Sequence, residues 1–328
     1  DVTFADGADI ITASAGTSNF RAGVNAGNSI ASGGNYNVTV GDEAGTAITT
    51  GDFNSAFGYI ALDGNTTGGR NSAFGAGALG TMNVTDGSNT YNTAVGFNAG
   101  TTVTTGIGNT LLGGLSGDAL TDADFNVAVG YLALSADTLG SNSVAVGMNA
   151  LQGQNFTSAT NVYNTAVGHG AGAEVTTGVN NTLIGGLAGD AITTGSQITA
   201  IGEHAAGKTT TASNNTAIGR TAMYDNTTGA SNVAVGTDAL YFNTTASNNT
   251  AVGYQSLYDN TTGVRNSAYG DNSLANNTTA NNNNAFGYLS LFTNTTGTAN
   301  VAMGTEALYS NTTAANNTAV GYQAGYSN

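Results

Sequence analysis

The chain of 328 residues contains no cysteine, no proline and no tryptophan, and only 8% of its residues are charged. The absence of cysteine excludes disulfides and thiolate metal sites, and it leaves the redox compartment open. Since a typical globular domain is about 25% charged, this chain cannot cover its surface with salt bridges. It needs an architecture stabilised mainly by backbone hydrogen bonds and by stacked rows of small side chains.

Basic residues are especially scarce, because five Lys and Arg stand against 20 Asp and Glu, which gives a net charge of −15. A protein that binds nucleic acid needs a basic stripe to displace counterions, and anionic membrane surfaces attract basic segments. No apolar run approaches the roughly 18–20 residues of a membrane span, and no signal peptide is visible. The composition therefore predicts no nucleic-acid partner and no membrane insertion.

What the chain does have is glycine in a short, regular motif. The sequence Asn-Thr-Ala-Val-Gly occurs four times, first at Asn92–Gly96, and variants of it fill the intervals. Fourteen intervals between motif glycines are 17 residues and two are 21, so the intervals before Gly96 and Gly168 each hold four extra residues. The motif glycines are Gly41, Gly58, Gly75, Gly96, Gly113, Gly130, Gly147, Gly168, Gly185, Gly202, Gly219, Gly236, Gly253, Gly270, Gly287, Gly304 and Gly321.

Each repeat position has its own residue type when the motif glycine is numbered 0. Position −4 is Asn except at Ser143 and Ile198, position −2 is Ala except at Thr39, Leu111 and Leu183, and position −1 is always apolar. Position +3 is Ala or Ser, position +4 is Leu or Gly in most copies, and positions +8 and +9 are Thr-Thr in 12 of 16 copies. Such regularity indicates stacked, equivalent structural units.

A unit this short is too small for a helical hairpin repeat, which needs about 33 residues or more, and suits one coil of a solenoid. We therefore predict an all-β, parallel β-solenoid of about 17 coils over residues 36–328. Positions −4 to −1 and +1 to +5 read as strands, and the Asn-Thr-Thr stretch reads as the return loop. The Asn at −4 would form a ladder, and the four-residue insertions would bulge without shifting the register. Residues 1–35 lack the repeat and read as an N-terminal cap, a degenerate coil or a junction segment.

The apolar rows predict a homo-oligomer. Positions −2 and −1 are adjacent, so their side chains face opposite ways in a strand, and positions +3 and +4 repeat the pattern. If the Ala rows fill a narrow interior, the bulkier Val, Ile, Phe and Leu rows lie outside, and a long exposed apolar stripe usually marks an interface. The alternative places the bulky rows inside a wider coil.

The motif resembles the head repeats of trimeric autotransporter adhesins (YadA-like heads), whose signature is Ser-Val-Ala-Ile/Val-Gly. Ser143-Val144-Ala145-Val146-Gly147 fits that signature directly. The fuller pattern, with Ala-Leu and Asn-Thr-Thr after the glycine, resembles repeats in bacteriophage tail fibres and large bacterial surface proteins. The resemblance covers residues 36–328, although the adhesin head unit is shorter. It implies a homotrimeric, left-handed parallel β-roll and a role in adhesion or as a fibre shaft.

Residues that could carry chemistry are few and scattered. His169 and His204 stand at variable positions two coils apart, too far for a shared metal ion. The acidic group Asp118, Asp122 and Asp124 is the best candidate for weak calcium binding through carboxylates, but we predict no ordered metal. We predict no catalytic residue, no cofactor and no enzymatic activity. The Asn-Thr-Thr sites match the N-glycosylation pattern, yet Asn and Thr are also good turn residues; these sites start at Asn65, Asn226, Asn243, Asn260, Asn277, Asn294 and Asn311.

Aromatic residues recur at two positions and allow two interpretations. The first is a structural ladder or interface seam, since stacked rings contribute about 0.5–1.5 kcal/mol per pair beyond burial. The second is a sugar-binding stripe. Position +5 holds Tyr224, Tyr241, Tyr258, Phe292, Tyr309 and Tyr326, and position +1 holds Tyr254, Tyr288 and Tyr322.

The function predicted from these features is structural. The chain reads as a shaft segment of an extracellular fibre, either a bacterial adhesin or a phage tail fibre. Its partners would be further copies of itself and a cell-surface glycan or receptor. Two alternatives stay open, a self-assembling extracellular filament and an ice-binding solenoid that uses its Thr arrays.

Overall fold

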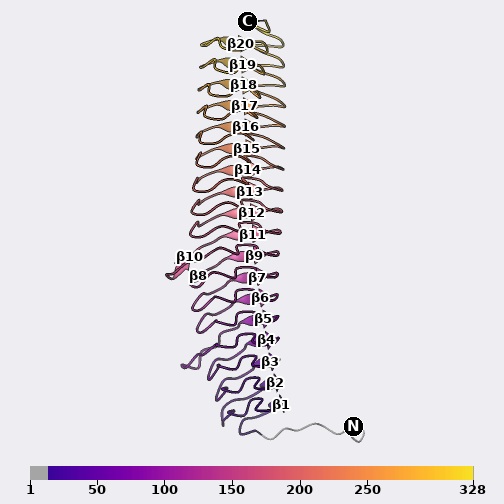
Figure 1. Ribbon diagram of the computed structural model, residues 1–328, viewed down its shortest axis with the longest axis vertical. Coiled ribbons are helices and arrows are strands. Elements are labelled where there is room, and N and C mark those ends of the chain that lie inside the picture. The colour runs from indigo at the N-terminus through magenta and orange to yellow at the C-terminus, as the bar shows by residue number, and fades with distance from the viewer. Residues whose placement is uncertain (1–13, 328) are drawn as a thin grey trace, which may run out of the picture. The chain divides into compact units, whose positions relative to one another are not determined.

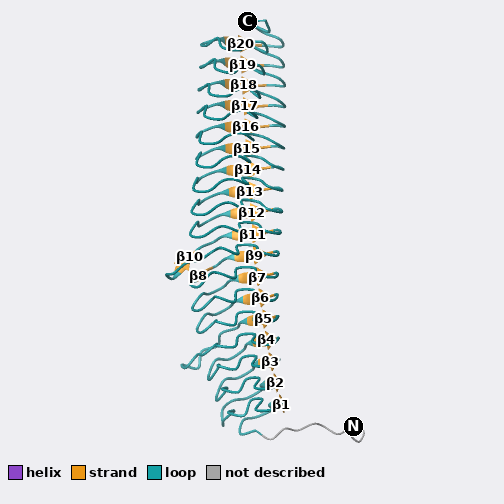
Figure 2. Ribbon diagram, viewed as in Figure 1, coloured by secondary structure: helices purple, strands orange, loops and turns teal. Residues whose placement is uncertain are grey.

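The computed structural model describes residues 14–327, and these fold as a parallel β-solenoid of about 18 turns without a helix. No part of this range forms a helix that could cross a membrane. Each turn of about 17 residues contributes one three-residue strand, and the remainder is loop and tight turn (Figure 2). The predicted all-β parallel solenoid is thus confirmed. The chain forms two compact units, residues 14–142 with 156–161 and residues 143–155 with 162–327.

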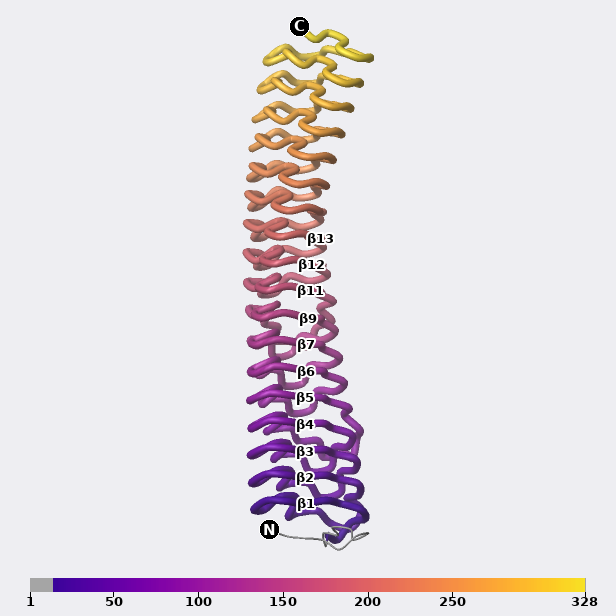
Figure 3. Tube along the Cα trace, turned by 90° about the vertical axis from the view of Figure 1, so that its right-hand side faces the viewer, coloured from indigo at the N-terminus to yellow at the C-terminus, as the bar shows by residue number. Residues whose placement is uncertain are grey.

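In the first unit seven three-residue strands stack in parallel, one from each turn (Figures 1 and 3). The pairing sets each repeat position beside the same position of the next turn, as with Phe57 and Phe74. A separate pair of two-residue strands, β8 and β10, lies to one side of this stack (Figure 1). The strands of this unit are β1 (Phe20–Ala22), β2 (Val38–Val40), β3 (Ser55–Phe57), β4 (Ser72–Phe74), β5 (Thr93–Val95), β6 (Thr110–Leu112), β7 (Val127–Val129), β8 (Gly140–Ser141) and β10 (Thr160–Asn161).

The second unit repeats the same arrangement over eleven strands. Register is again strict, since Ala251 pairs with Ala268 and Ala268 with Ala285. The strands are β9 (Val144–Val146), β11 (Thr165–Val167), β12 (Thr182–Ile184), β13 (Thr199–Ile201), β14 (Thr216–Ile218), β15 (Val233–Val235), β16 (Thr250–Val252), β17 (Ser267–Tyr269), β18 (Asn284–Phe286), β19 (Val301–Met303) and β20 (Thr318–Val320).

The stack begins one turn earlier than residue 36, where the recognisable repeat starts. β1 pairs in register with β2, and Gly23 has the same left-handed backbone as the motif glycines, with φ of 136°. Asn19 takes the place of the motif asparagine, because its Oδ1 accepts from the Asn37 N–H at 2.8 Å. Residues 19–35 therefore form a further turn, and residues 1–13 lie outside the described range.

Positions +1 to +5 are not a second strand, and that prediction is wrong. They form tight turns in which positions 0, +2 and +4 have positive φ in every turn. The alternation directs backbone N–H groups to both neighbouring turns. The Thr221 N–H donates to the Glu203 carbonyl of the preceding turn at 2.9 Å, and the Met223 N–H donates to the Ala239 carbonyl of the following turn at 2.9 Å. These bonds satisfy the backbone without extended conformation.

The interior is narrow and filled by small side chains together with one leucine row. Position −2 is buried in the strands from β2 onward, while positions −3 and −1 face outward, as the alternation of a strand requires. The leucines at +4 were predicted outside with the bulky row, but Leu62, Leu240 and Leu257 are fully buried. Their φ of 52° to 55° breaks the alternation, so positions +3 and +4 both point inward.

The predicted asparagine ladder at position −4 is present. The amides of Asn71, Asn109 and Asn317 donate to the amide oxygen of the preceding turn, but most bonds of the ladder go to the backbone. Asn249 Oδ1 accepts from the Asn266 N–H of the next turn at 3.0 Å. Its Nδ2 donates across the interior to the Gly263 carbonyl at 2.8 Å, and its own N–H donates to Asn232 Oδ1 at 2.9 Å. One fully buried amide therefore closes its own turn and fixes the register of both neighbours.

The two insertions leave the register unchanged, as predicted. Ser72 pairs with Thr93 across the first insertion and Val144 pairs with Thr165 across the second. The extra residues form excursions from the turn, and in the second excursion Thr160 and Asn161 add the short strand β10.

Candidate interaction surfaces

The outward face of the strands carries no charge, and it combines an apolar column at position −1 with a column at position −3 that is mainly Ser and Thr. Positions −3 and −1 form two columns along each unit, and position −1 is Val, Ile, Leu, Phe, Tyr or Met in every turn except at Ala22. The sequence contains five basic and 20 acidic residues, yet none stands at −3 or −1 in any turn of the described residues. Charge is depleted in the same way in the cores of protein interfaces.

The side chains of the −1 column touch one another and stay open to solvent. Phe57 stacks on Phe74 and Tyr269 stacks on Phe286, each with ring centroids 4.8 Å apart. Phe74 is 39% exposed and Met303 is 46% exposed. The bulky −1 row therefore lies outside and the Ala row inside, as the sequence predicts.

Position +1 adds a second exposed aromatic column directly after the glycine corner. In both units the rings occur in alternate turns over part of the length. They are Tyr59, Phe97 and Tyr131 in the first unit and Tyr254, Tyr288 and Tyr322 in the second.

The aromatic residues at +5 form the predicted structural ladder. Tyr224, Tyr241 and Tyr258 follow one another with centroid distances of 5.3 and 5.4 Å, and Phe292, Tyr309 and Tyr326 form a second run. Partial burial raises the pKa of the Tyr241 and Tyr258 hydroxyls. Because each ring covers its neighbour, these columns offer ring edges to solvent, and a stacked sugar needs a free ring face.

A further aromatic column at position −5 of the first unit was not predicted. Tyr36 stacks on Phe53 at 5.0 Å, and the Arg70 guanidinium lies 5.3 Å from the Phe53 ring and 5.7 Å from the Tyr91 ring. Position −5 has positive φ throughout, so a repeat alignment classes it as a loop. The available signal was an aromatic residue directly before the motif asparagine, as in Tyr36-Asn37 and Tyr91-Asn92.

The Asn-Thr-Thr sites are structural. Asn243 is fully buried, and its Nδ2 donates to Asn226 Oδ1 at 2.8 Å and to the Ala246 carbonyl at 3.0 Å. A glycan cannot be attached to this nitrogen in the folded chain. The same amide-to-amide ladder continues through Asn260, Asn277, Asn294 and Asn311.

The paired threonines of these sites do not act alike. At +8 the Thr227 hydroxyl donates to the Thr244 carbonyl of the next turn at 3.0 Å, and Thr244 does the same to Thr261 at 3.2 Å. At +9, Thr228 and Thr245 are exposed. Each turn of this run therefore presents one free threonine at these positions.

The histidines and the acidic group stay apart. His169 is exposed, whereas the His204 ring packs edge-on against Tyr224 at 5.8 Å. Asp122 accepts from the Thr105 hydroxyl and Asp124 accepts from a backbone N–H, while burial raises the pKa of Asp118. Within residues 14–327, no three His, Cys, Asp or Glu side chains converge as metal ligands.

Comparison with protein-family models and with curated protein sequences finds no match to this chain.

Proposed function

We propose that this chain is a shaft segment of an extracellular fibre, in which three parallel copies pack through their −1 columns. The observation that carries the proposal is the continuous apolar −1 column on an uncharged strand face. The resemblance of the motif to adhesin heads and tail-fibre repeats favours three copies, a left-handed coil and an extracellular location at a virion tail or a bacterial surface. A fibre of this kind supplies reach and attachment, and no enzymatic role is needed.

The exposed apolar area of the −1 column is close to the size that a stable protein interface needs. If each −1 side chain leaves about 60 Å² uncovered, the eleven turns of the second unit present on the order of 650 Å². A stable interface buries about 800 Å² per partner, so the −1 column and the neighbouring +1 rings together are of the right size. When parallel copies surround a common axis, the −1 side chains of neighbouring copies contact one another in the same way at every turn.

The first test is the solution mass, measured by light scattering. We expect three times the chain mass of 32.3 kDa. The double substitution Ile201→Asp with Ile218→Asp sets two charges on the outward face and should reduce the mass to that of one chain. The matched control, Thr228→Asp with Thr245→Asp, adds the same charges at exposed +9 positions and should stay trimeric.

Two outcomes would redirect the proposal. A monomeric wild-type chain would contradict the interface, and a thermal-hysteresis assay would then test the ice-binding alternative. Particles that lengthen with concentration in electron micrographs would favour the self-assembling filament.

A further inference from the structure

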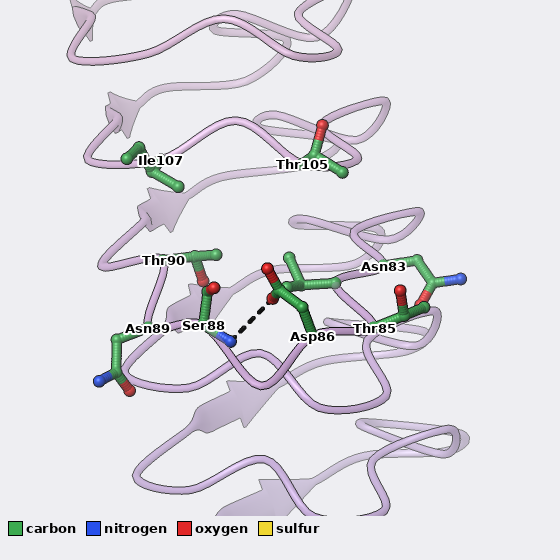
Figure 4. A pocket seen from close by; sticks show the side chains of 9 residues that line it. Asn83, Thr85, Asp86, Ser88, Asn89, Thr90, Thr105 and Ile107 are labelled. Atoms are coloured by element: carbon green, nitrogen blue, oxygen red, sulfur yellow. Dashed lines mark hydrogen bonds between the residues drawn. The ribbon is translucent and has the colours of Figure 1, made fainter.

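The first four-residue insertion forms a pocket on the surface of the first unit. Residues 83–90 leave the turn and enclose a space of about 500 Å³ against the following turn (Figure 4). Figure 4 shows Asp86 and Ser88 on the insertion, with Thr105 and Ile107 on the following turn. All of these residues belong to the first unit. The volume falls within the range of about 300–1,000 Å³ that is usual for small-molecule sites.

The lining of this pocket consists mainly of hydroxyl and amide groups. Thr85, Ser88 and Asn89 line it together with the aliphatic side chains of Val84 and Ile107. Within the described part of the chain, the side chain of Thr85 makes no hydrogen bond. The Asn89 amide points away from the following turn, and its Oδ1 lies near Gly69 of the preceding turn (Figure 4). Hydroxyl groups beside aliphatic side chains suit a ligand that is rich in hydroxyl groups.

The charge of the pocket points to a neutral ligand. Asp86 is its one charged residue, and it accepts from the Ser88 N–H at 2.9 Å. Together with the net charge of −15, this carboxylate repels anionic ligands. A single carboxylate is also too few for a divalent cation, which prefers several oxygen ligands with charge.

An exposed aromatic residue follows the pocket in the sequence. Tyr91 comes directly after the lining residue Thr90 and is 59% exposed. The guanidinium of Arg70 lies on the ring from the preceding turn. In the following turn, position −5 is Gly108, and the Phe125 ring of the next turn partly fills the space that a side chain there would take. The apolar C–H face of a sugar ring packs on such a surface, while its hydroxyl groups reach the amides and hydroxyls beside it.

We propose that this pocket binds a neutral saccharide, with one sugar ring packed on Tyr91 and its hydroxyl groups bonded to Thr85 and Asp86. The binding does not depend on the oligomeric state of the chain. In a fibre it would supply an attachment point on the shaft itself, away from the strand face.

Saturation-transfer NMR on the full chain tests the proposal, with lactose, maltose, cellobiose and N,N′-diacetylchitobiose as probes. A shallow saccharide site has a Kd on the order of 1 mM, which this method detects. We expect saturation transfer to at least one disaccharide. The substitutions Thr85→Ala and Tyr91→Ala should weaken its binding at least about tenfold. Tyr36→Ala, which removes a ring of similar exposure from the same column, should leave the affinity unchanged.

Deletion of residues 86–89 gives a second, independent variant, because it restores the spacing of the regular repeat. We expect an unchanged far-ultraviolet spectrum, an unchanged mass by light scattering and no binding. The proposal is overturned if none of the four probes shows transfer, or if the deletion variant binds like the wild type. If the deletion prevents folding, the two single substitutions, which replace exposed side chains, still test whether the pocket binds the saccharide.

Discussion

Two adjacent glycines allow a sharp test of how the turns stack. Gly185 is a motif glycine with φ of 135°, and a Cβ there would lie 2.6 Å from the Gly202 carbonyl oxygen of the next turn. An Ala at this site occupies a backbone region open only to glycine, which costs about 1–3 kcal/mol. It also overpacks against backbone that cannot rotate away, which costs about 1–3 kcal/mol more. Gly185→Ala should therefore lower the free energy of unfolding by about 2–6 kcal/mol.

Gly186 is the matched control, since a Cβ there would meet nothing within 4 Å and its φ is not in the left-handed region. Gly186→Ala should be neutral or stabilise by about 0.4–1 kcal/mol through the unfolded chain. Unfolding in guanidinium chloride measures the free energy of unfolding of both variants. In Gly185→Ala, amide hydrogen exchange should become faster in the turns of Gly185 and Gly202, because each turn contacts only its neighbours. Equal stability of the two variants would refute the close stacking of the motif glycines.

Three further predictions concern the interior and the acidic groups. Asn249→Ala leaves the buried Asn266 N–H unpaired, while the Gly263 carbonyl keeps its bond from Asn260 Nδ2. It should lower the free energy of unfolding by about 1–3 kcal/mol in the same assay, whereas exposed Thr245→Ala should change it by less than about 0.5 kcal/mol. Gly189→Ala brings a Cβ to 2.6 Å from Ile192 Cδ1. In a double-mutant cycle, this substitution should lower the free energy of unfolding by about 1 kcal/mol less in the Ile192→Ala variant than in the wild type, because the clash is then relieved. Burial raises the pKa of four aspartates, so the folded chain binds their protons more readily than the unfolded chain does. The melting temperature should therefore rise as the pH falls through the raised pKa values toward 3.8. A melting temperature that falls between pH 7 and about pH 5 would contradict this prediction. The four aspartates are Asp63, Asp118, Asp190 and Asp259.

The stacked strands could be predicted because their signal is periodic. A glycine at constant spacing fixes the register, and the alternation of Ala and Val at −2 and −1 fixes which row is inside. The asparagine at −4 could be assigned to a ladder for the same reason. Its partners could not be foreseen, because the bond from Asn249 to Gly263 crosses the interior and joins two parts of one turn.

The turns and the surfaces were harder to predict because their backbone is left-handed at non-glycine residues. Leu257 has φ of 52° and points inward, whereas a strand at +1 to +5 would have turned it outward. The pocket beside Tyr91 depends on how four extra residues close against the next turn, and no repeat pattern describes a feature that departs from the repeat.

The exceptions to the repeat show how the volume of the interior is balanced. In six described turns with Gly at +4, position +7 is Ile, Val or Leu, whereas in six of the nine turns with Leu at +4 it is Asn. Gly189 leaves room for Ile192 of its own turn, and Leu183 at −2 fills space beside both Gly189 and Gly172 of the preceding turn. Leu111 likewise lies beside Gly117 and beside Gly100 of the preceding turn. Volume is therefore balanced within a turn and with the turn before it, while the amide at −4 and the glycine at 0 hold neighbouring turns in register. This division lets turns with different interiors stack on one another, so the solenoid can lengthen by duplication of turns without loss of the outward apolar face.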